Sequence, residues 1–100
     1  MARKVIVSKT AQKKLDDLFE YLIDEWSERV KNKFIGKLDK NIELIQANPE
    51  IFPKSNKAKG LNRCVITKQI TLYFRYNSKR IDIVTVFDTR QNPSKLKKSI

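Results

Sequence analysis

Two apolar stripes with helical spacing follow one another almost without a gap, and they constrain the fold more than any other feature. The first stripe consists of Ala11, Leu15, Leu18, Leu22 and Trp26. The second consists of Val30, Phe34, Leu38, Ile42 and Ile45. Steps of three and four residues mark one face of an α-helix. Ser8 and Ser27 stand where N-caps are needed, and Pro49 disfavours helical geometry before it. We therefore predict helices over 9–26 and from Ser27 to Asn48, folded back as an antiparallel hairpin.

After the hairpin the apolar period changes to two, which is typical of β-strands. Residues 49–60 contain two prolines, a glycine and three lysines and are predicted to form a loop. Strands are predicted at about 61–67, 70–76 and 80–88, with a further short strand at 3–7. The predicted fold class is α+β: an N-terminal strand, an antiparallel helical hairpin and a three-strand antiparallel meander, with the helices packed on one sheet face.

The length and composition set the outer limits of the prediction. One hundred residues suit a single domain over 1–100, in which 94–100 form a basic tail. No apolar run approaches the roughly 18 to 20 residues needed to span a bilayer, so we expect no membrane partner. Val5-Ile6-Val7 is too short for the apolar region of a signal peptide. A cytoplasmic protein is the default expectation.

Two residues are assigned to packing. Cys64 is the single cysteine and the chain has no histidine, so we expect neither a disulfide nor a metal site, and no cofactor. A cysteine within a strand is expected to act as a small buried hydrophobe. Trp26, at the end of the first helix, is predicted to pack in the core or within the hairpin.

The charge is distributed unevenly along the chain. The net charge is +11; residues 1–50 hold 10 basic against 9 acidic residues, and residues 51–100 hold 12 against 2. The halves therefore carry 10 − 9 = +1 and 12 − 2 = +10. Such an excess favours an anionic partner, either nucleic acid or an acidic protein, over a merely solubilising surface.

Candidate binding residues lie on the sheet face that the helices leave open. Alternation predicts Arg63, Tyr73 and Arg75 on that face, with Arg90 at its rim. Each has a structural alternative: an ion pair with Asp82 for the strand arginines, strand packing for Tyr73, and a salt bridge for Arg90. Further basic candidates in the loop and the tail are Lys54, Lys57, Lys59, Lys95, Lys97 and Lys98.

Five segments carry a resemblance to a known family. They are "SKTAQKKLDDLFEYLIDEW", "NPEIFPKS", "GLNRCVI", "ITLYFRY" and "RIDIVTVFDTRQNP". In this order, over roughly residues 4 to 93, the chain resembles the RelE/ParE superfamily of bacterial toxins. The resemblance implies the toxin of a type II toxin–antitoxin pair, held inactive by a cognate acidic antitoxin that wraps its surface.

The resemblance leaves the target open, because the RelE-like branch cleaves messenger RNA on the ribosome and the ParE-like branch inhibits DNA gyrase. RNA cleavage needs a base, an acid and stabilisation of the phosphorane charge. The chain has no histidine and no tyrosine after Tyr76, and Thr71 stands where several ribonuclease members carry an arginine. Arg90 does match the arginine that commonly follows the last strand. Gyrase is therefore slightly favoured.

Two alternatives to gyrase inhibition stay open. One is a ribosome-dependent endoribonuclease, with lysine-based catalysis from Lys54, Lys57, Lys59 or Lys95. The other is a non-toxic basic module that binds nucleic acid. Whether the chain is an enzyme is thus not decided by the sequence.

Overall fold

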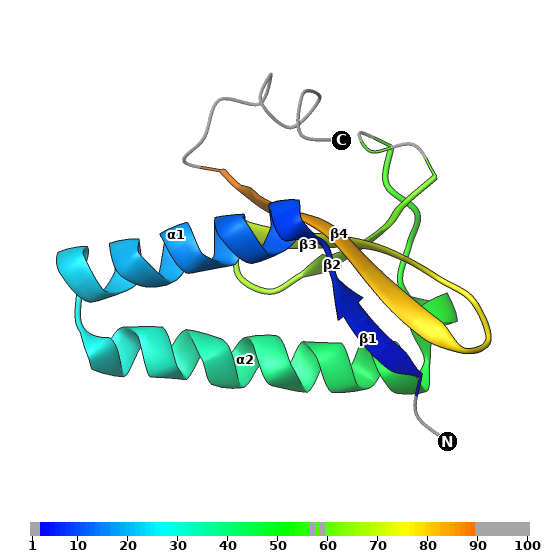
Figure 1. The fold of residues 1–100 in the computed structure, drawn as a ribbon, viewed down its shortest axis with the longest axis horizontal. Helices are drawn as coiled ribbons and strands as arrows, with labels where there is room; N and C mark the ends of the chain where they lie inside the picture. The colour runs from blue at the N-terminus through cyan, green and yellow to red at the C-terminus, as the bar shows by residue number, and fades with distance from the viewer. Residues whose placement is uncertain (1–2, 57, 59, 90–100) are drawn as a thin grey trace.

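The computed structural model describes residues 3–56, 58 and 60–89 (Figure 1). Its elements, in chain order, are β1 (Lys4–Val7), α1 (Lys9–Glu25), α2 (Glu28–Ala47), the short 3-10 helix η1 (Pro49–Ile51), β2 (Asn62–Val65), β3 (Ile70–Tyr76) and β4 (Arg80–Asp88). The predicted α+β fold is confirmed, and β3 and β4 have the predicted bounds.

Serine side chains start both helices. The Ser8 hydroxyl accepts a hydrogen bond from the backbone N–H of Ala11 at 3.0 Å. The Ser27 hydroxyl accepts a hydrogen bond from the backbone N–H of Val30 at 3.2 Å. Each bond satisfies one of the amides that a first helical turn leaves without a partner. Trp26 and Ser27 alone separate α1 from α2, so the helices reverse direction abruptly and form the predicted hairpin.

The four strands form one sheet in the order β1-β4-β3-β2. β1 runs parallel to β4, whereas the other neighbours are antiparallel. Tyr73 is opposite Thr85 but Phe74 is opposite Ile83, so Val84 forms a bulge in β4. Ser8 bonds to this bulge, since its hydroxyl donates to the Val84 carbonyl at 2.6 Å and its N–H to the Ile83 carbonyl at 3.0 Å. The bulge thereby fixes where α1 begins.

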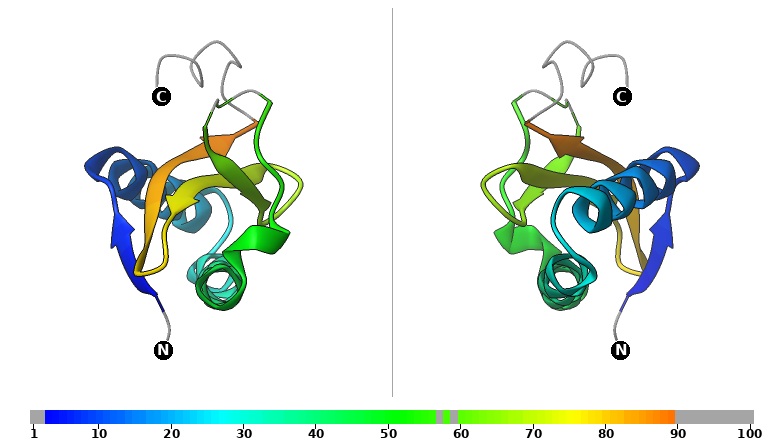
Figure 2. Two further views of the ribbon diagram at one scale, coloured as in Figure 1. Left: turned by 90° about the vertical axis from the view of Figure 1, so that its right-hand side faces the viewer. Right: turned by 90° about the vertical axis from the view of Figure 1, so that its left-hand side faces the viewer.

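The main core lies between the hairpin and one face of the sheet (Figure 2). Its most deeply buried members include Ala11, Ile45, Leu72, Phe74 and Ile81, each with no measurable exposure. Phe52 packs edge-on against Phe74, with 5.8 Å between the ring centroids. The apolar faces predicted for the helices and for β3 thus meet one another, as the fold class requires.

The turn of the hairpin extends beyond the sheet (Figure 1). Trp26 is 68% exposed, so the prediction that it packs in the core or within the hairpin is wrong. The apolar stripe of α1 continues to Trp26, but no strand lies beneath it there. Helical spacing predicts which face of a helix is apolar and does not predict how far the opposing layer extends.

Candidate functional surfaces

The sheet face away from the helices is positively charged. Arg75 lies opposite Asp82, and Arg80 precedes Asp82 by two residues, so all three side chains share this face. Lys4 pairs with Arg80 across the parallel β1–β4 ladder and joins them. We call the exposed cations of this face the basic sheet face: Lys4, Arg63, Arg75 and Arg80. Exposed Lys54 lies beside β2 through its bridge to Asn62.

Asp82 is the one carboxylate that the described register places on the basic sheet face. Its Oδ1 forms an ion pair with the Arg80 Nε at 3.3 Å, and its Oδ2 forms a longer one with the Arg75 Nε at 3.9 Å. The alternative of a cross-strand ion pair is therefore confirmed for Arg75. The Arg75 and Arg80 side chains are still 68% and 53% exposed. Each guanidinium carries five N–H donors, so most of them remain open to a ligand.

Tyr73 lies within a second, smaller apolar cluster on the same side of the sheet. The members are Ala58, Leu61, Tyr73 and Phe87, with Val84 packed against them. Tyr73 is 4% exposed, so its ring is not available for stacking on a base in this conformation. The packing alternative fits this geometry. The loop that covers the cluster is attached to β2 by the Arg63 N–H, which donates to the Pro53 carbonyl at 2.9 Å.

Cys64 has the environment of a packing residue, as the sequence predicts. It is 2% exposed, and its thiol donates a weak hydrogen bond to the Asn41 Oδ1 at 3.4 Å. Burial raises the pKa of this thiol from 9.0 to about 11, because desolvation penalises the thiolate. Among the described residues no group of three or more His, Cys, Asp or Glu side chains could hold a metal ion.

Six of the predicted site residues lie outside the described residues: Lys57, Lys59, Arg90, Lys95, Lys97 and Lys98. Conversely, Lys4 and Arg80 join the basic sheet face although sequence reasoning missed them. The alternation of Arg80 with Asp82 was visible in the sequence. The parallel pairing that brings in Lys4 was not, because no local pattern specifies a neighbour 76 positions away.

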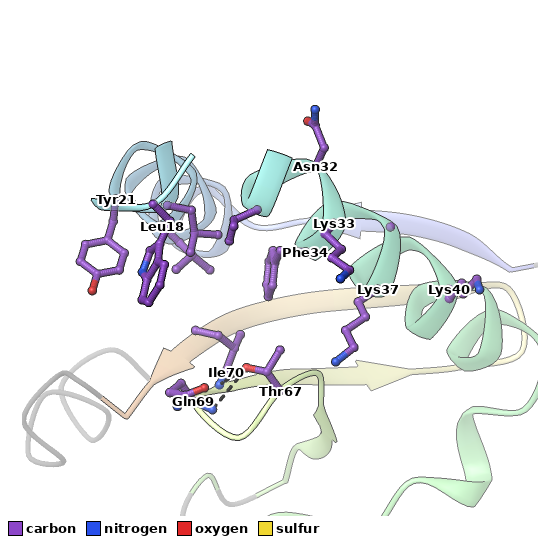
Figure 3. Close-up of a pocket in the computed structure, with 14 residues that line it drawn as sticks. Leu18, Tyr21, Asn32, Lys33, Phe34, Lys37, Lys40, Thr67, Gln69 and Ile70 are labelled. Atoms are coloured by element: carbon purple, nitrogen blue, oxygen red, sulfur yellow. Dashed lines mark hydrogen bonds between the residues drawn. The ribbon is translucent and has the colours of Figure 1, made fainter. Parts of the chain in front are cut away.

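A second surface feature is an apolar groove below the hairpin turn (Figure 3). We call it the hairpin groove; it has a volume of about 870 Å³ and lies between the two helices and the β2–β3 connection. Its lining comprises Leu18, Tyr21, Leu22, Trp26, Val30, Asn32, Lys33, Phe34, Gly36, Lys37, Lys40, Thr67, Gln69 and Ile70. The apolar side chains at its mouth are partly exposed: Tyr21 by 38%, Val30 by 37% and Trp26 by 68%.

Comparison with known proteins identifies the family of the chain. The sequence matches the model of the ParE toxin of the type II toxin–antitoxin system, parDE, over residues 5–93. The chain therefore belongs to the ParE family of type II toxins, which confirms the resemblance inferred from the five segments. No helix within the described ranges is both long and apolar enough to cross a bilayer.

A solved structure supports the fold independently. The chain is similar to one from the chromosomal ParDE toxin–antitoxin system of P. aeruginosa, with a TM-score of 0.70 and 14% sequence identity. The match covers 87% of this chain and 96% of that chain. At this identity the likeness shows the shared fold. A search of curated proteins gives no match.

Proposed function

We propose that this protein is a cytoplasmic bacterial toxin, kept inactive by a cognate acidic antitoxin, that arrests growth when free by inhibiting DNA gyrase. Membership of the ParE family supports the class. The solved neighbour comes from a system named for both a ParE and a ParD component, which supports an antitoxin partner.

The observation that supports the choice of target is that the described part of the basic sheet face is cationic and offers neither a histidine nor an exposed tyrosine nor a carboxylate free of arginine contacts. RNA cleavage through the 2′-hydroxyl needs a base and an acid beside the phosphate. The chain contains no histidine, Tyr73 is buried, and Asp82 is engaged by two arginines. Inhibition by binding needs no proton transfer. Exposed guanidinium groups fit this role, because they bind carboxylates and phosphates through several donors at once.

The proposed target contact uses Arg63 and Arg75 of the basic sheet face. Arg80 of the same face flanks them on β4, and Lys54 flanks them beside β2. A surface with this excess of positive charge also speeds association with an acidic partner at low salt. Arg90 and the basic tail stay predicted contributors, on the strength of the sequence pattern alone.

The direct test is a supercoiling assay with purified gyrase and relaxed plasmid. We expect inhibition by the purified chain, relieved by the protein encoded in the adjacent reading frame if that protein is small and acidic. In cells, induction should stop growth and trigger DNA damage signalling while transcripts stay intact. Transcripts cut during translation, with supercoiling unaffected, would favour the ribonuclease. Uninterrupted growth would favour the non-toxic binding module.

Variants of the basic sheet face sharpen this test. Arg63→Ala combined with Arg75→Ala should raise the half-inhibitory concentration about tenfold or more, because two charge-assisted contacts are lost. Lys13→Ala is a control, since Lys13 is also exposed but lies on α1. Equal potency of the double variant and the control would remove the basic sheet face from the proposal.

A further inference from the structure

We infer that the basic sheet face binds the phosphate backbone of double-stranded DNA directly, without reading its sequence. This contact deepens the proposed function, because gyrase acts on duplex DNA and a toxin that holds DNA itself would engage the enzyme together with its substrate. Only that purpose rests on the proposed function. The choice of ligand rests on the charge, burial and spacing of the side chains on this face.

The cations of the face are distributed over all four strands. Lys4 lies on β1, Arg80 on β4, Arg75 on β3 and Arg63 on β2, and all four are exposed. Neighbouring strands lie about 4.8 Å apart, so four strands span about 14 Å. Over that length duplex DNA presents about eight phosphate charges. The array therefore suits a continuous line of negative charge better than a single phosphate or carboxylate.

Asp82 orients two of these arginines without neutralising the face. It contacts the Nε atoms of Arg80 and Arg75, whose side chains stay 53% and 68% exposed. A guanidinium group binds phosphate oxygens through two parallel donors when it is held in a fixed direction. Lys4, Arg75 and Arg80 against one carboxylate leave 3 − 1 = +2 on this part of the face.

The apolar side chains on this side of the sheet are covered, which favours DNA over a protein partner. Leu61, Tyr73 and Phe87 are 4%, 4% and 7% exposed, and Val65 at the end of β2 is the exception at 57%. Protein–protein interfaces have a desolvated core in which charged residues are depleted. Protein–DNA interfaces are more polar and much more positively charged. The described part of the basic sheet face has the second composition.

The same burial favours a duplex over a single strand. Proteins that hold single-stranded nucleic acid combine cations with exposed aromatic rings on which the bases stack. Tyr73 and Phe87, whose rings lie in the apolar cluster on this side, are buried. Contacts to the backbone alone position a protein on a duplex and carry no sequence information. We therefore expect equal affinity for duplexes of unrelated sequence.

The test is the fluorescence anisotropy of a labelled duplex, titrated with the purified chain at salt concentrations from about 50 to about 200 mM. Each neutralised phosphate contributes about −0.9 to the slope of log K against log salt, so four contacts predict a slope of roughly −3.6 or steeper. A second duplex of unrelated sequence should bind equally. A slope near zero, or a strong preference for one sequence, would overturn the inference.

Charge-matched variants separate the face from the net charge of the chain. Arg63→Ala combined with Arg75→Ala should weaken binding at least tenfold and reduce the magnitude of the slope by about two, because two phosphate contacts are lost. Lys13→Ala combined with Lys33→Ala removes the same charge from exposed positions on α1 and α2 and should leave the slope unchanged. Equal losses in both pairs would mean that DNA responds only to net charge, and would remove the site.

A charge-retaining pair guards against misfolding. Arg63→Lys combined with Arg75→Lys should keep most of the affinity, since binding to a DNA backbone depends mainly on the number of phosphates neutralised. Its melting curve shows whether the fold is intact. A lysine pair that melts like the original chain but binds as weakly as the alanine pair would contradict a backbone contact.

Poly-glutamate distinguishes DNA from an acidic protein as the ligand of the face. An extended peptide carries one charge per about 3.3 Å at most, whereas duplex DNA carries one per about 1.7 Å. Poly-glutamate of equal total charge should therefore displace little of the labelled duplex. Full displacement would show that the face takes carboxylates as readily as phosphates, and would overturn the choice of DNA.

The supercoiling assay keeps this inference distinguishable from the proposed function. If the chain inhibits gyrase while the Arg63 and Arg75 alanine pair binds DNA as well as the original chain does, the DNA contact fails and the proposed function stands. If the chain binds duplex DNA through this face but leaves supercoiling unaffected, the proposed function fails and the DNA contact stands.

Discussion

The two ends of the helical hairpin differ in burial, although the same apolar stripes with helical spacing run along both. At the sheet end, Ala11 and Ile45 are fully buried against the strands. At the turn, Trp26 is 68% exposed and Val30 37%, although both continue the same apolar stripes. The difference lies in what opposes the helices: four strands at one end, and the hairpin groove at the other.

This contrast separates residues that stabilise the fold from residues that are available to a partner. An apolar side chain contributes to folding only in proportion to the area it removes from water. The exposed part of the stripe therefore contributes little to the stability of the isolated chain. Variants at the two ends should therefore differ in stability.

The largest expected effect contrasts Phe74→Ala with Trp26→Ala. Phe74, on the helix-facing side of β3, is fully buried and packs against Phe52. Its truncation leaves a cavity and should lower the free energy of unfolding by about 3 to 5 kcal/mol. Trp26→Ala removes a larger but mostly exposed side chain and should cost less than about 1 kcal/mol. Urea denaturation of both variants measures the difference. Comparable losses would mean that the turn is part of the stabilising core.

Ionisation tests the buried end of this comparison, at the thiol of Cys64. The pKa of Cys64 is raised from 9.0 to about 11 in the folded chain. The neutral Cys64 thiol therefore contributes fully to the free energy of unfolding below pH 9. This contribution is lost as the pH rises toward 11, because the unfolded chain releases the proton first. A pKa difference of two units corresponds to roughly 2 to 3 kcal/mol of stability.

Comparison with Cys64→Ala isolates this contribution from other groups that titrate in alkali. The variant should start less stable at pH 8, since a buried atom is lost. Its stability should then fall less steeply between pH 9 and 11 than that of the original chain. Parallel curves would show that the thiol reaches solvent before global unfolding, and that the core at the sheet end is looser than its burial indicates.

Sequence reasoning reached the fold because its signals are local. Helical spacing, the two serine caps, Pro49 and the alternation in β3 each act within a few residues, and each was confirmed by the structure. The order of the strands and the bulge at Val84 depend on contacts between distant segments. No local pattern in the chain encodes them.

The surfaces were harder to predict for the same reason. Arg75 was assigned to the open face, but its ion pair with Asp82 was only one of two alternatives before the register was known. Trp26 was assigned to packing because apolar residues at helical spacing usually face a core. The hairpin groove could not be predicted from the apolar stripes, because it exists only where the sheet ends short of the turn.

The smallest expected effect compares the two serine caps. Both hydroxyls accept one amide hydrogen bond at the start of a helix, at 3.0 Å for Ser8 and 3.2 Å for Ser27. Ser8 also donates to the Val84 carbonyl at 2.6 Å, whereas Ser27 lies at the overhanging turn. Loss of a cap costs about 1 kcal/mol, and an unsatisfied part-buried carbonyl adds about another 1 kcal/mol.

Ser8→Ala should therefore cost about 2 kcal/mol and Ser27→Ala about half as much, measured by thermal unfolding of both variants. Ser8→Thr is the control, because threonine keeps the hydroxyl that serves both partners. If Ser27→Ala proved the more damaging change, the turn would be a determinant of stability. The two ends of the hairpin would then contribute alike to stability, although Trp26 at the turn is 68% exposed.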